Sequence, residues 1–398
     1  MPIPTPFHER TQALCSSYRW KDWSGYCAVC SFDTSHEREY FAFRESAGLL
    51  DVTPLYKYEV TGPDVAAVLA RMMVRDVSKL KVGRVGYTCW CDDEGKVIDD
   101  GTVSRLGENH FRVTAADPSL HWIEAVSRGF DVRVEDSSAR LAALALQGPT
   151  SRAILREATG DPKVEALKFF GVTQSTIRGI PVWITRTGYT GDLGYEVWVE
   201  RGDALPVWDA LMAAGQPHGI EAAGLDALDV TRIEAGFILL GVDYFSAEKV
   251  VLESRKSTPL ELGFGWMVDL ERGNFIGRDA IAAEMKRGSL WHLVGLEVSW
   301  EELEALYAGF NLPPSLPVTA RRDALPIYAD DGRHIGQATS HTWSPILKKY
   351  LAIASVRPGF EAKGTKLQIE HTVEYERRKV TATVALTPFY DPERKRKP

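Results

Sequence analysis

The sequence predicts an α+β fold that ends in a β-barrel, and two observations favour this fold class. Through the first 285 residues, segments with the alternating pattern of strands are interleaved with helical segments and hairpins. After Gly288 the chain becomes a series of short strand-like segments separated by turns, which is typical of a barrel. We therefore expect two α+β domains in residues 1–285, with an uncertain boundary between them, and a barrel with a short basic tail in residues 286–398.

The first domains are expected to contain many short elements. The segment before residue 47 is rich in aromatic residues and precedes a helix-like stretch that ends near Gly48. The expected strands are 56–60, 84–91, 96–98, 111–114, 130–135, 141–147, 181–186 and 195–200, and the expected helices are 65–73, 119–127, a segment after 149, and 227–235. Asp64 is the candidate cap of the helix at 65–73, and Gly95 stands in a hairpin turn where a positive φ is expected.

The barrel is expected to form from six short strands. Their predicted bounds are 293–298, 325–328, 335–339, 351–356, 366–370 and 380–384. The proline-rich stretch 312–317 is interpreted as an insertion within this domain.

Composition limits the classes of function. The 398 residues are 44% hydrophobic, which is enough for a substantial core, and 54 acidic against 47 basic residues give a formal charge of -7. No apolar run approaches the ~18 residues that span a bilayer, and residues 1–10 lack the apolar stretch of a secretory signal. We expect a cytoplasmic protein without nucleic-acid or membrane partners, and we interpret the basic cluster Arg394–Lys397 as a solvated tail.

The cysteines do not form a convincing framework. There are five, an odd number in a long chain, which argues against structural disulfides. Cys27 with Cys30 and Cys89 with Cys91 could offer four thiolates to zinc, but Cys-x-Cys within a strand is not the usual knuckle spacing. We expect ordinary, partly buried thiols and no metal.

Two adjacent carboxylates follow the apolar pair Val97-Ile98 near the end of the first hairpin. Because successive residues on a strand face opposite sides, at most one of Asp99 and Asp100 can point into a given pocket. A carboxylate at this position is not needed for a turn, so either is a candidate functional group, and the other is expected to be a solvated or structural group.

The loop Gly188–Glu196 is the most informative local motif. Three glycines would bring the backbone close to a flat partner, and Tyr189, Tyr195 and Glu196 offer an aromatic surface with a carboxylate. This combination suits a heterocycle that presents an N–H and an amino group in parallel, as pterins and guanines do. The loop has strands on both sides and no Lys-Ser/Thr pair after it, so it is not a phosphate loop. The alternative to a ligand-binding loop is an ordinary hairpin loop with surface acids.

A third cluster lies on the helix at 227–235. Asp229 and Arg232 are three residues apart and share one helix face, so they could simply pair. Alternatively, Arg232 could anchor the carboxylate of a ligand.

Taken together, these segments resemble the glycine cleavage T-protein (aminomethyltransferase) family, which includes related tetrahydrofolate-dependent demethylases. The matching motifs run in family order from about Ala47 to Asp391. They are Leu50-Asp-Val52, Tyr87, Gly95–Asp100, Leu146–Pro149, Lys168–Gly171, Thr187–Gly191, Gly194–Glu196, Asp229–Gly236, Pro259–Trp266, Phe275–Ala280 and Thr342–Pro345. The resemblance implies three domains arranged as a ring around a site for the cofactor tetrahydrofolate.

The resemblance also implies roles for individual residues. Asp99, the first aspartate of Val-Ile-Asp-Asp, would be the catalytic residue beside the reactive nitrogens of the folate. Glu196 would hold the pterin ring, Tyr87 and Tyr189 would border the folate, Arg232 would fix its position or its polar tail, and Trp266 would form an aromatic wall. The implied activity is transfer of an aminomethyl or methyl group from a small amine-like donor, with a lipoyl carrier protein or a separate flavoprotein as a possible partner.

Departures from the family motifs leave the donor open. The chain has Thr53-Pro54, Thr114 and Leu228 where the family usually has Ser-His, Asn and Arg. A demethylase of a methylated amine, a sulfonium compound or an aromatic methyl ether is one alternative. We consider Tyr56 and Thr114 as substrate residues; rings at Tyr56, Tyr58 and Trp90 could surround a methylated cation or belong to the core. A non-catalytic folate-binding protein is also considered. Relatives of that kind, which assist iron-sulfur assembly, carry a Lys-Gly-Cys-Tyr motif in the second half of the chain. This alternative is disfavoured, because no cysteine follows Cys91.

Overall fold

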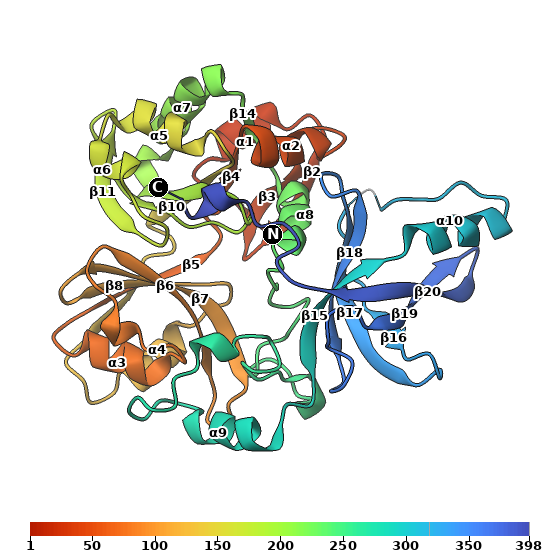
Figure 1. The fold of residues 1–398 in the computed structure, drawn as a ribbon. Coiled ribbons are helices and arrows are strands. Elements are labelled where there is room, and N and C mark those ends of the chain that lie inside the picture. The colour runs from red at the N-terminus through yellow and green to blue at the C-terminus, as the bar shows by residue number, and fades with distance from the viewer. Residues whose placement is uncertain (318, 398) are drawn as a thin grey trace.

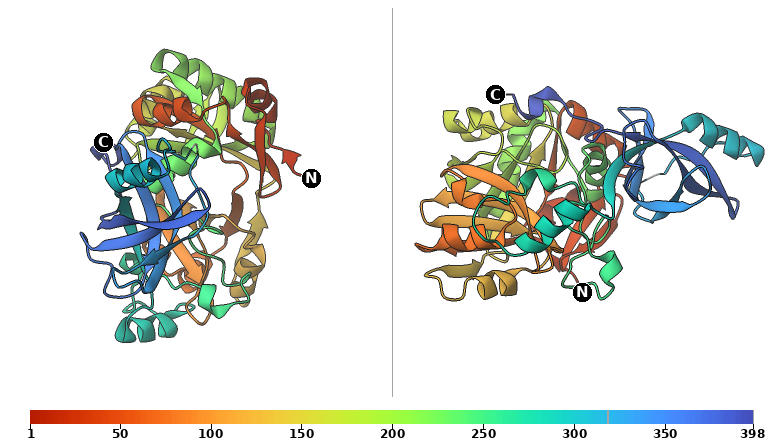
Figure 2. Two further views of the ribbon diagram at one scale, coloured as in Figure 1. Left: turned by 90° about the vertical axis from the view of Figure 1, so that its right-hand side faces the viewer. Right: turned by 60° about the horizontal axis from the view of Figure 1, so that its bottom comes forward.

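The computed structural model describes residues 1–317 and 319–397. Two lobes of mixed helix and sheet and a closed barrel surround the middle of the molecule (Figure 1). The barrel projects to one side of the two sheet-containing lobes (Figure 2). The predicted α+β class with a barrel at the end is therefore confirmed.

The lower lobe of Figure 1 is built on a five-stranded sheet with the order β6-β7-β8-β5-β9. Its strands are β5 (Tyr56–Thr61), β6 (Arg84–Cys91), β7 (Val97–Gly107), β8 (His110–Ala115) and β9 (Arg133–Asp136). Two helices, α3 (Val65–Met72) and α4 (Leu120–Val126), pack their apolar residues against one face. Asp64 precedes α3 as expected, but its carboxylate accepts from the Asp131 N–H rather than capping the helix.

The upper lobe is built on a six-stranded sheet with the order β11-β12-β13-β10-β4-β14. Its strands are β4 (Ala47–Asp51), β10 (Leu141–Gln147), β11 (Val172–Ile177), β12 (Ile180–Thr185), β13 (Gly194–Glu200) and β14 (Ile220–Ala222). The helices of this lobe are α2 (Glu37–Glu45), α5 (Ser151–Thr159), α6 (Pro162–Glu165), α7 (Ala204–Gly215) and α8 (Leu225–Glu234).

Strand β10 shows why this sheet is central. Every residue of the strand is buried, because helices cover both of its faces. Leu144 and Leu146 pack with α5 and α7, whereas Ala143 and Ala145 pack with α2 and α8. Small residues on the second face let α8 lie close to the sheet, and α8 carries Arg232.

The segment before the first sheet strand differs from the prediction. The expected helix ends at Glu45, and Ala47–Asp51 forms β4, because Leu49 and Leu50 are buried on opposite faces of the sheet as strand residues are. Before them lie elements that we did not predict: α1 (His8–Leu14) and a sheet of β1 (Ile3–Pro4), β2 (Arg19–Trp23) and β3 (Tyr26–Ser31).

The barrel closes in the order β15-β18-β17-β16-β19-β20. Its strands are β15 (His292–Val298), β16 (Leu325–Tyr328), β17 (His334–Ser344), β18 (Lys349–Val356), β19 (Lys366–Val373) and β20 (Glu376–Ala385). All six were predicted, several of them too short. Two helices, α9 (Arg278–Arg287) before the barrel and α10 (Trp300–Gly309) within it, were not.

The basic tail is only partly solvated: Arg396 and Lys397 are exposed as expected, whereas Arg394 and Lys395 dock on the protein. The chain crosses from β20 to the upper lobe (Figure 1), where Arg186 donates to the carbonyl of Lys395 at 3.2 Å. Arg394 makes a 2.7 Å ion pair with the fully buried Asp192. Lys395 itself is buried. A counter-charge and backbone partners on the upper lobe hold the segment in place.

The cysteines and the helices add two findings. All five cysteines are free thiols, and the described residues contain no group of three or more His, Cys, Asp or Glu side chains that could hold a metal ion. Throughout residues 1–317 and 319–397, no helix has the length and apolar character that a membrane span requires.

Candidate functional site

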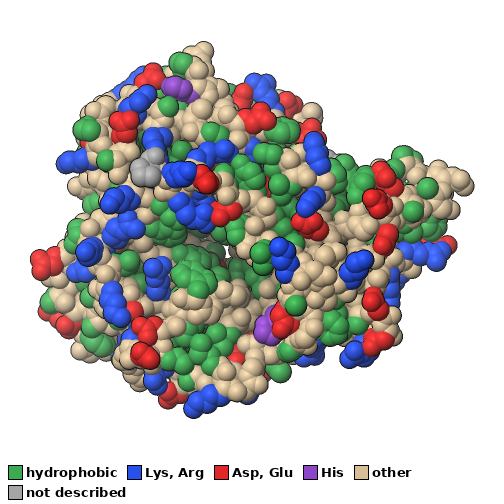
Figure 3. Space-filling model, viewed as in Figure 1, with side chains coloured by type: hydrophobic (Ala, Val, Ile, Leu, Met, Phe, Trp, Pro, Cys, Tyr) green, Lys and Arg blue, Asp and Glu red, His purple; other side chains and the backbone are tan. Residues whose placement is uncertain are grey.

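A cavity of about 1550 Å³ lies where the lobes meet. The lower sheet contributes Tyr87, Asp100 and Thr114, the upper lobe contributes Tyr189 and Glu196, and further walls come from α8, the barrel and the tail. The space-filling view shows the molecule hollowed at this junction, with hydrophobic side chains around the opening (Figure 3). Most ligand pockets measure ~300–1,000 Å³, so this one can hold more than one small molecule.

The cavity receives Asp100 and not Asp99. The register between β6 and β7 shifts at Ile98, because Trp90 pairs with Asp99 while Cys91 already pairs with Val97. This bulge places both Ile98 and Asp99 on the buried side of the sheet. If side chains alternated regularly after the buried Ile98, Asp99 would face the cavity. Because the bulge adds one residue, Asp100 faces the cavity instead.

The Asp99 carboxylate has a structural environment. It accepts backbone N–H groups from Asp100 at 2.7 Å, Ala116 at 3.0 Å and Asp117 at 2.9 Å. Burial raises the pKa of Asp99 well above its usual range, and the charge of Asp100 adds to this, while two of these N–H bonds oppose it. Asp99 therefore fixes the loop after β8. It does not line the cavity, where the resemblance had placed it as the catalytic residue.

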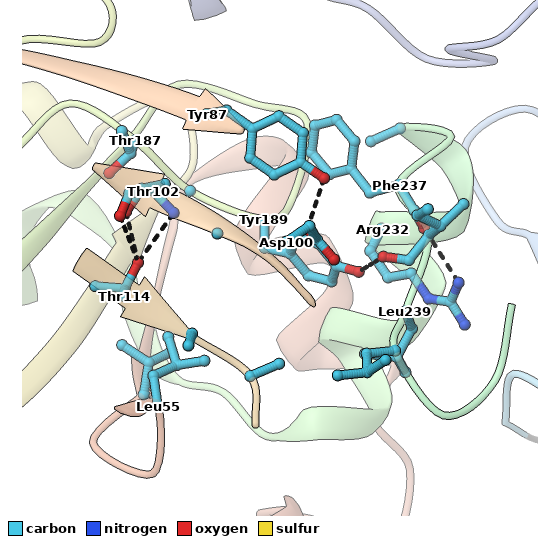
Figure 4. A pocket seen from close by; sticks show the side chains of 18 of the residues that line it. Leu55, Tyr87, Asp100, Thr102, Thr114, Thr187, Tyr189, Arg232, Phe237 and Leu239 are labelled. Carbon is cyan, nitrogen blue, oxygen red and sulfur yellow. Dashed lines mark hydrogen bonds between the residues drawn. The ribbon is translucent and has the colours of Figure 1, made fainter. Parts of the chain in front are cut away.

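Asp100 is held by two tyrosines at the cavity wall. The Tyr87 hydroxyl donates to Oδ2 of Asp100 at 2.6 Å (Figure 4), and the Tyr244 hydroxyl donates to Oδ1. Burial raises the pKa of Asp100, and the two hydroxyls lower it. The pKa values of both tyrosines are raised well above the usual value by burial and then by the Asp100 charge, so they remain donors. The arrangement presents an oriented carboxylate that can accept charge or a proton.

Glu196 faces the cavity from β13 with few partners. Among the described residues it accepts one hydrogen bond, from Oγ1 of Thr185 at 3.4 Å. Burial raises the pKa of Glu196 to about 7. A half-buried carboxylate with free acceptor capacity is stabilised by a ligand that supplies donors, so Glu196 is suited to a ligand with adjacent N–H groups.

The glycines of the loop do not serve the purpose that we expected. A Cβ at Gly188 or Gly194 would clash with the side-chain amide of Gln147, which donates to the carbonyls of Thr187 and Tyr195 at 3.1 and 3.2 Å. The flat partner of these glycines is thus an internal amide. Gly191, in the left-handed region at φ 75°, packs against Ala235, the residue that follows α8.

Tyr189 continues the aromatic surface beside Glu196. Its ring stacks on Phe237 with centroids 5.5 Å apart, and its hydroxyl donates to the carbonyl of Ile238. The Lys395 ammonium lies 5.1 Å from the centroid of the Phe237 ring. At the rim, Trp266 is 64% exposed and lies beneath the Arg75 guanidinium.

Arg232 lines the cavity but is bound within the protein. It donates from Nε to Asp229 at 2.8 Å and from a terminal nitrogen to Asp243 at 2.7 Å. The same terminal nitrogen donates to the Phe237 carbonyl at 3.1 Å (Figure 4). Its other terminal nitrogen donates to Ser340 at 2.8 Å. The pairing interpretation is thus confirmed for Asp229, and Arg232 joins α8 to the barrel.

The two candidate substrate residues separate. Thr114 lines the cavity and shares a 2.6 Å hydrogen bond with Thr102 (Figure 4), whereas Tyr56 is not among the lining residues. Tyr58 and Trp90 are fully buried in the core of the lower lobe. The described aromatics therefore form no cage of Tyr56, Tyr58 and Trp90 at the cavity.

Sequence reasoning missed several residues of this site. Asp100 was considered and not chosen, and no sequence pattern reveals the bulge at Ile98 that selects it. Tyr244, Phe237, Lys21 and Arg322 come from loops and from the unpredicted β2, which no periodicity marks. Lys395 was visible only as part of a charge run.

Comparison with known sequences covers almost the whole chain. The family model "GCVT N-terminal domain" matches residues 7–272, and the model "Glycine cleavage T-protein C-terminal barrel domain" matches residues 307–391. The chain is 32% identical to the aminomethyltransferases of Geobacillus sp. and Bacillus subtilis, over 93% and 90% of its length and 94% and 91% of theirs.

A further relative is longer. The chain is 36% identical, over 98% of its length, to a trimethylamine-oxide aldolase from Ruegeria pomeroyi, but it spans only 47% of that protein. Among solved structures, the glycine cleavage system aminomethyltransferase T from Bartonella henselae superposes with a TM-score of 0.83 at 24% identity, covering 98% of this chain and 99% of the other. That likeness shows the fold.

Proposed function

Because the chain belongs to the glycine cleavage T-protein family, we propose that it transfers a one-carbon unit from a small amine-like donor to tetrahydrofolate. The observation that carries this proposal is that two carboxylates of different character line one cavity. Glu196 has free acceptor capacity, and Asp100 is oriented by two hydroxyls. The cavity volume supports a site that binds the folate and the donor together.

The residues present fit a pterin ring. A pterin offers a ring N–H and an amino group side by side, and the carboxylate of Glu196 can accept both. The stacked rings of Tyr189 and Phe237 provide an apolar surface beside it. When bound, tetrahydrofolate would supply the nitrogen nucleophile that receives the carbon.

Asp100 is proposed as the catalytic residue, in place of Asp99. The hydroxyls of Tyr87 and Tyr244 hold its carboxylate in one orientation, and burial raises its pKa towards the range where it can exchange a proton. Its carboxylate can stabilise positive charge on a reacting nitrogen, take up a proton, and return it to the departing amine nitrogen. Such an effect contributes a few kcal/mol, about 10²–10⁴-fold in rate.

The donor is the open part of the proposal. An aminomethyl group on a lipoyl carrier protein is one candidate, supported by the similarity to aminomethyltransferases along nearly their full length. A methylated amine is a second, supported by the similarity to the trimethylamine-oxide aldolase and by the apolar Leu228 and Leu55 at the cavity. A separate flavoprotein partner would be required if the donor is oxidised first.

Isothermal titration with tetrahydrofolate tests the proposal. We expect binding that weakens at least tenfold in Glu196→Ala. A product assay then compares aminomethyl-lipoyl protein, dimethylglycine, sarcosine, betaine, a sulfonium compound and a methoxyaromatic acid. Methylene-tetrahydrofolate or methyl-tetrahydrofolate as product separates aminomethyl transfer from demethylation. Absence of folate binding by the wild-type protein would refute the proposal.

A further inference from the structure

Two cations on the cavity wall come from segments outside the large sheets. Lys21 lies on β2, and Arg322 lies in the segment just before β16. Nε of Arg322 donates to Oδ2 of Asp229 at 2.8 Å, but no described residue accepts from its terminal nitrogens. No hydrogen bond or ion pair joins Lys21 to any described residue, although the side chain is half-buried.

Charge is not balanced around this pair. Oδ1 of Asp229 forms an ion pair with Arg232, and its Oδ2 forms one with Arg322. Asp243 also pairs with Arg232. The nearby Asp226 is paired with Arg19 at 2.7 Å. Asp229 and Asp243 are thus engaged by Arg232 and Arg322, and Asp226 is engaged by Arg19, so that Lys21 has no ion pair of its own among the described residues.

The cations also act on each other. Burial lowers the pKa of Lys21, and the charge of Arg322 lowers it further, whereas Asp229 and Asp226 raise it. Asp229 lies near both cations but is already bonded to Arg322 and Arg232, and an anion between Lys21 and Arg322 would relieve their repulsion. The neighbouring wall residues Leu225 and Leu228 carry no charge, so an anion at this place would be bound by Lys21 and Arg322.

We propose that Lys21 and Arg322 form a carboxylate-binding subsite of this cavity. The terminal nitrogens of Arg322 can hold two carboxylate oxygens, and the Lys21 ammonium can bind one of them from β2. The inference rests on the proposed function, which supplies two sources of a carboxylate: the glutamate tail of the folate, or the carboxyl group of an amino-acid-like donor such as dimethylglycine.

The test uses the full chain with Lys21→Met, Arg322→Gln and the double variant. Arg322→Lys keeps the charge, and Arg333→Gln removes an exposed cation on the barrel that pairs only with Asp331 among the described residues. Thermal unfolding checks that each variant is folded. Titrations measure the Kd of tetrahydrofolate and of 6-methyltetrahydropterin, which lacks the glutamate tail. Kinetic assays give KM for dimethylglycine and dimethylamine.

Two outcomes support the subsite and identify the carboxylate. If the double variant weakens tetrahydrofolate at least tenfold and 6-methyltetrahydropterin less than twofold, the subsite binds the folate tail. If tetrahydrofolate binding is unchanged but KM for dimethylglycine rises at least tenfold with that for dimethylamine unaltered, it binds the donor. In both cases Arg322→Lys should retain most of the affinity and Arg333→Gln should behave as wild type.

One result would overturn the proposed subsite. A folded double variant that binds tetrahydrofolate and uses dimethylglycine as the wild type does would overturn the subsite and leave the proposed function intact. Failure of the wild type to bind tetrahydrofolate would instead overturn the proposed function.

Discussion

The Tyr87 hydroxyl lies 2.6 Å from Oδ2 of Asp100, across the hairpin that joins β6 to β7. Together with the Tyr244 hydroxyl on Oδ1, it fixes a carboxylate at the cavity wall, while the adjacent Asp99 is turned into the protein by one extra residue in the strand. A single register shift thus decides which of two identical side chains lines the cavity.

Asn substitution of the two aspartates should have different effects. In Asp100→Asn, we expect tetrahydrofolate affinity within about threefold of wild type and a turnover loss of about 10²–10⁴-fold, because the amide cannot take up a proton. In Asp99→Asn, one carboxylate oxygen that accepts from backbone N–H groups is replaced by an NH2 group, so stability should fall by about 1–3 kcal/mol while most turnover remains. Single-turnover product formation and urea unfolding measure the two effects. The assignment fails if folded Asp99→Asn is the inactive variant.

Glu196 should make the stability of the free protein depend on pH. Its pKa in the folded state is raised to about 7 by burial, above the ordinary value of 4.5, so its contribution is present at low pH and is lost as pH rises from 4.5 through 7. Glu196→Gln should therefore be more stable than wild type at pH 8, by up to about 3 kcal/mol, and similar to it at pH 4. Thermal unfolding of both proteins at the two pH values tests this; a stability difference independent of pH would contradict it.

Gly101 should not tolerate a side chain. A Cβ at this position would collide with the carbonyl oxygen of Thr114, which is backbone and cannot rotate away. Gly101→Ala should destabilise the protein by about 2–4 kcal/mol and lower turnover, because Asp100 is its neighbour. Gly202→Ala, where nothing lies within 4 Å, is the matched control and should change stability by less than about 0.5 kcal/mol. Equal effects would show that packing at Gly101 is not the cause.

Removal of Arg44 should destabilise the whole chain. Its guanidinium makes a 2.5 Å ion pair with Glu234, and both side chains are fully buried. Arg44→Met would leave the Glu234 charge with hydroxyl partners alone, at a cost of about 3–5 kcal/mol. Adding Glu234→Gln should recover part of this loss in a urea-unfolding series. No recovery would mean that the charge imbalance is not responsible.

Periodicity predicted the regular part of the fold well. The bounds predicted for β10 and β16 match the structure, and the remaining barrel strands were found because alternating residues separate a core from solvent. The first β-hairpin of the chain was missed because aromatic residues in β2 and β3 do not alternate clearly in burial. The strand β4 was read as part of a helix, since a run buried on both faces has no period of two.

The site was predicted in part. Tyr87, Tyr189, Glu196, Arg232, Trp266 and Thr114 all line the cavity, and their roles there stay predictions. Asp99 was displaced by a bulge, which depends on hydrogen-bond register and leaves no trace in residue type. The partners of Arg232 and the docking of Lys395 depend on contacts between segments more than 100 residues apart, which no local pattern encodes.

The buried ion pair of Arg44 and Glu234 has a consequence for how the molecule comes apart. The hydroxyls of Tyr40 in α2 and Ser344 in the barrel both donate to Glu234. The ring centroid of Tyr390 lies 4.4 Å from Cζ of Arg44. The upper lobe, the barrel and the tail therefore all contact one buried ion pair. Departure of the barrel or of the tail would remove the Ser344 or the Tyr390 contact from this buried ion pair and open it to water. A ligand in the central cavity should therefore shift a single melting transition of the entire chain.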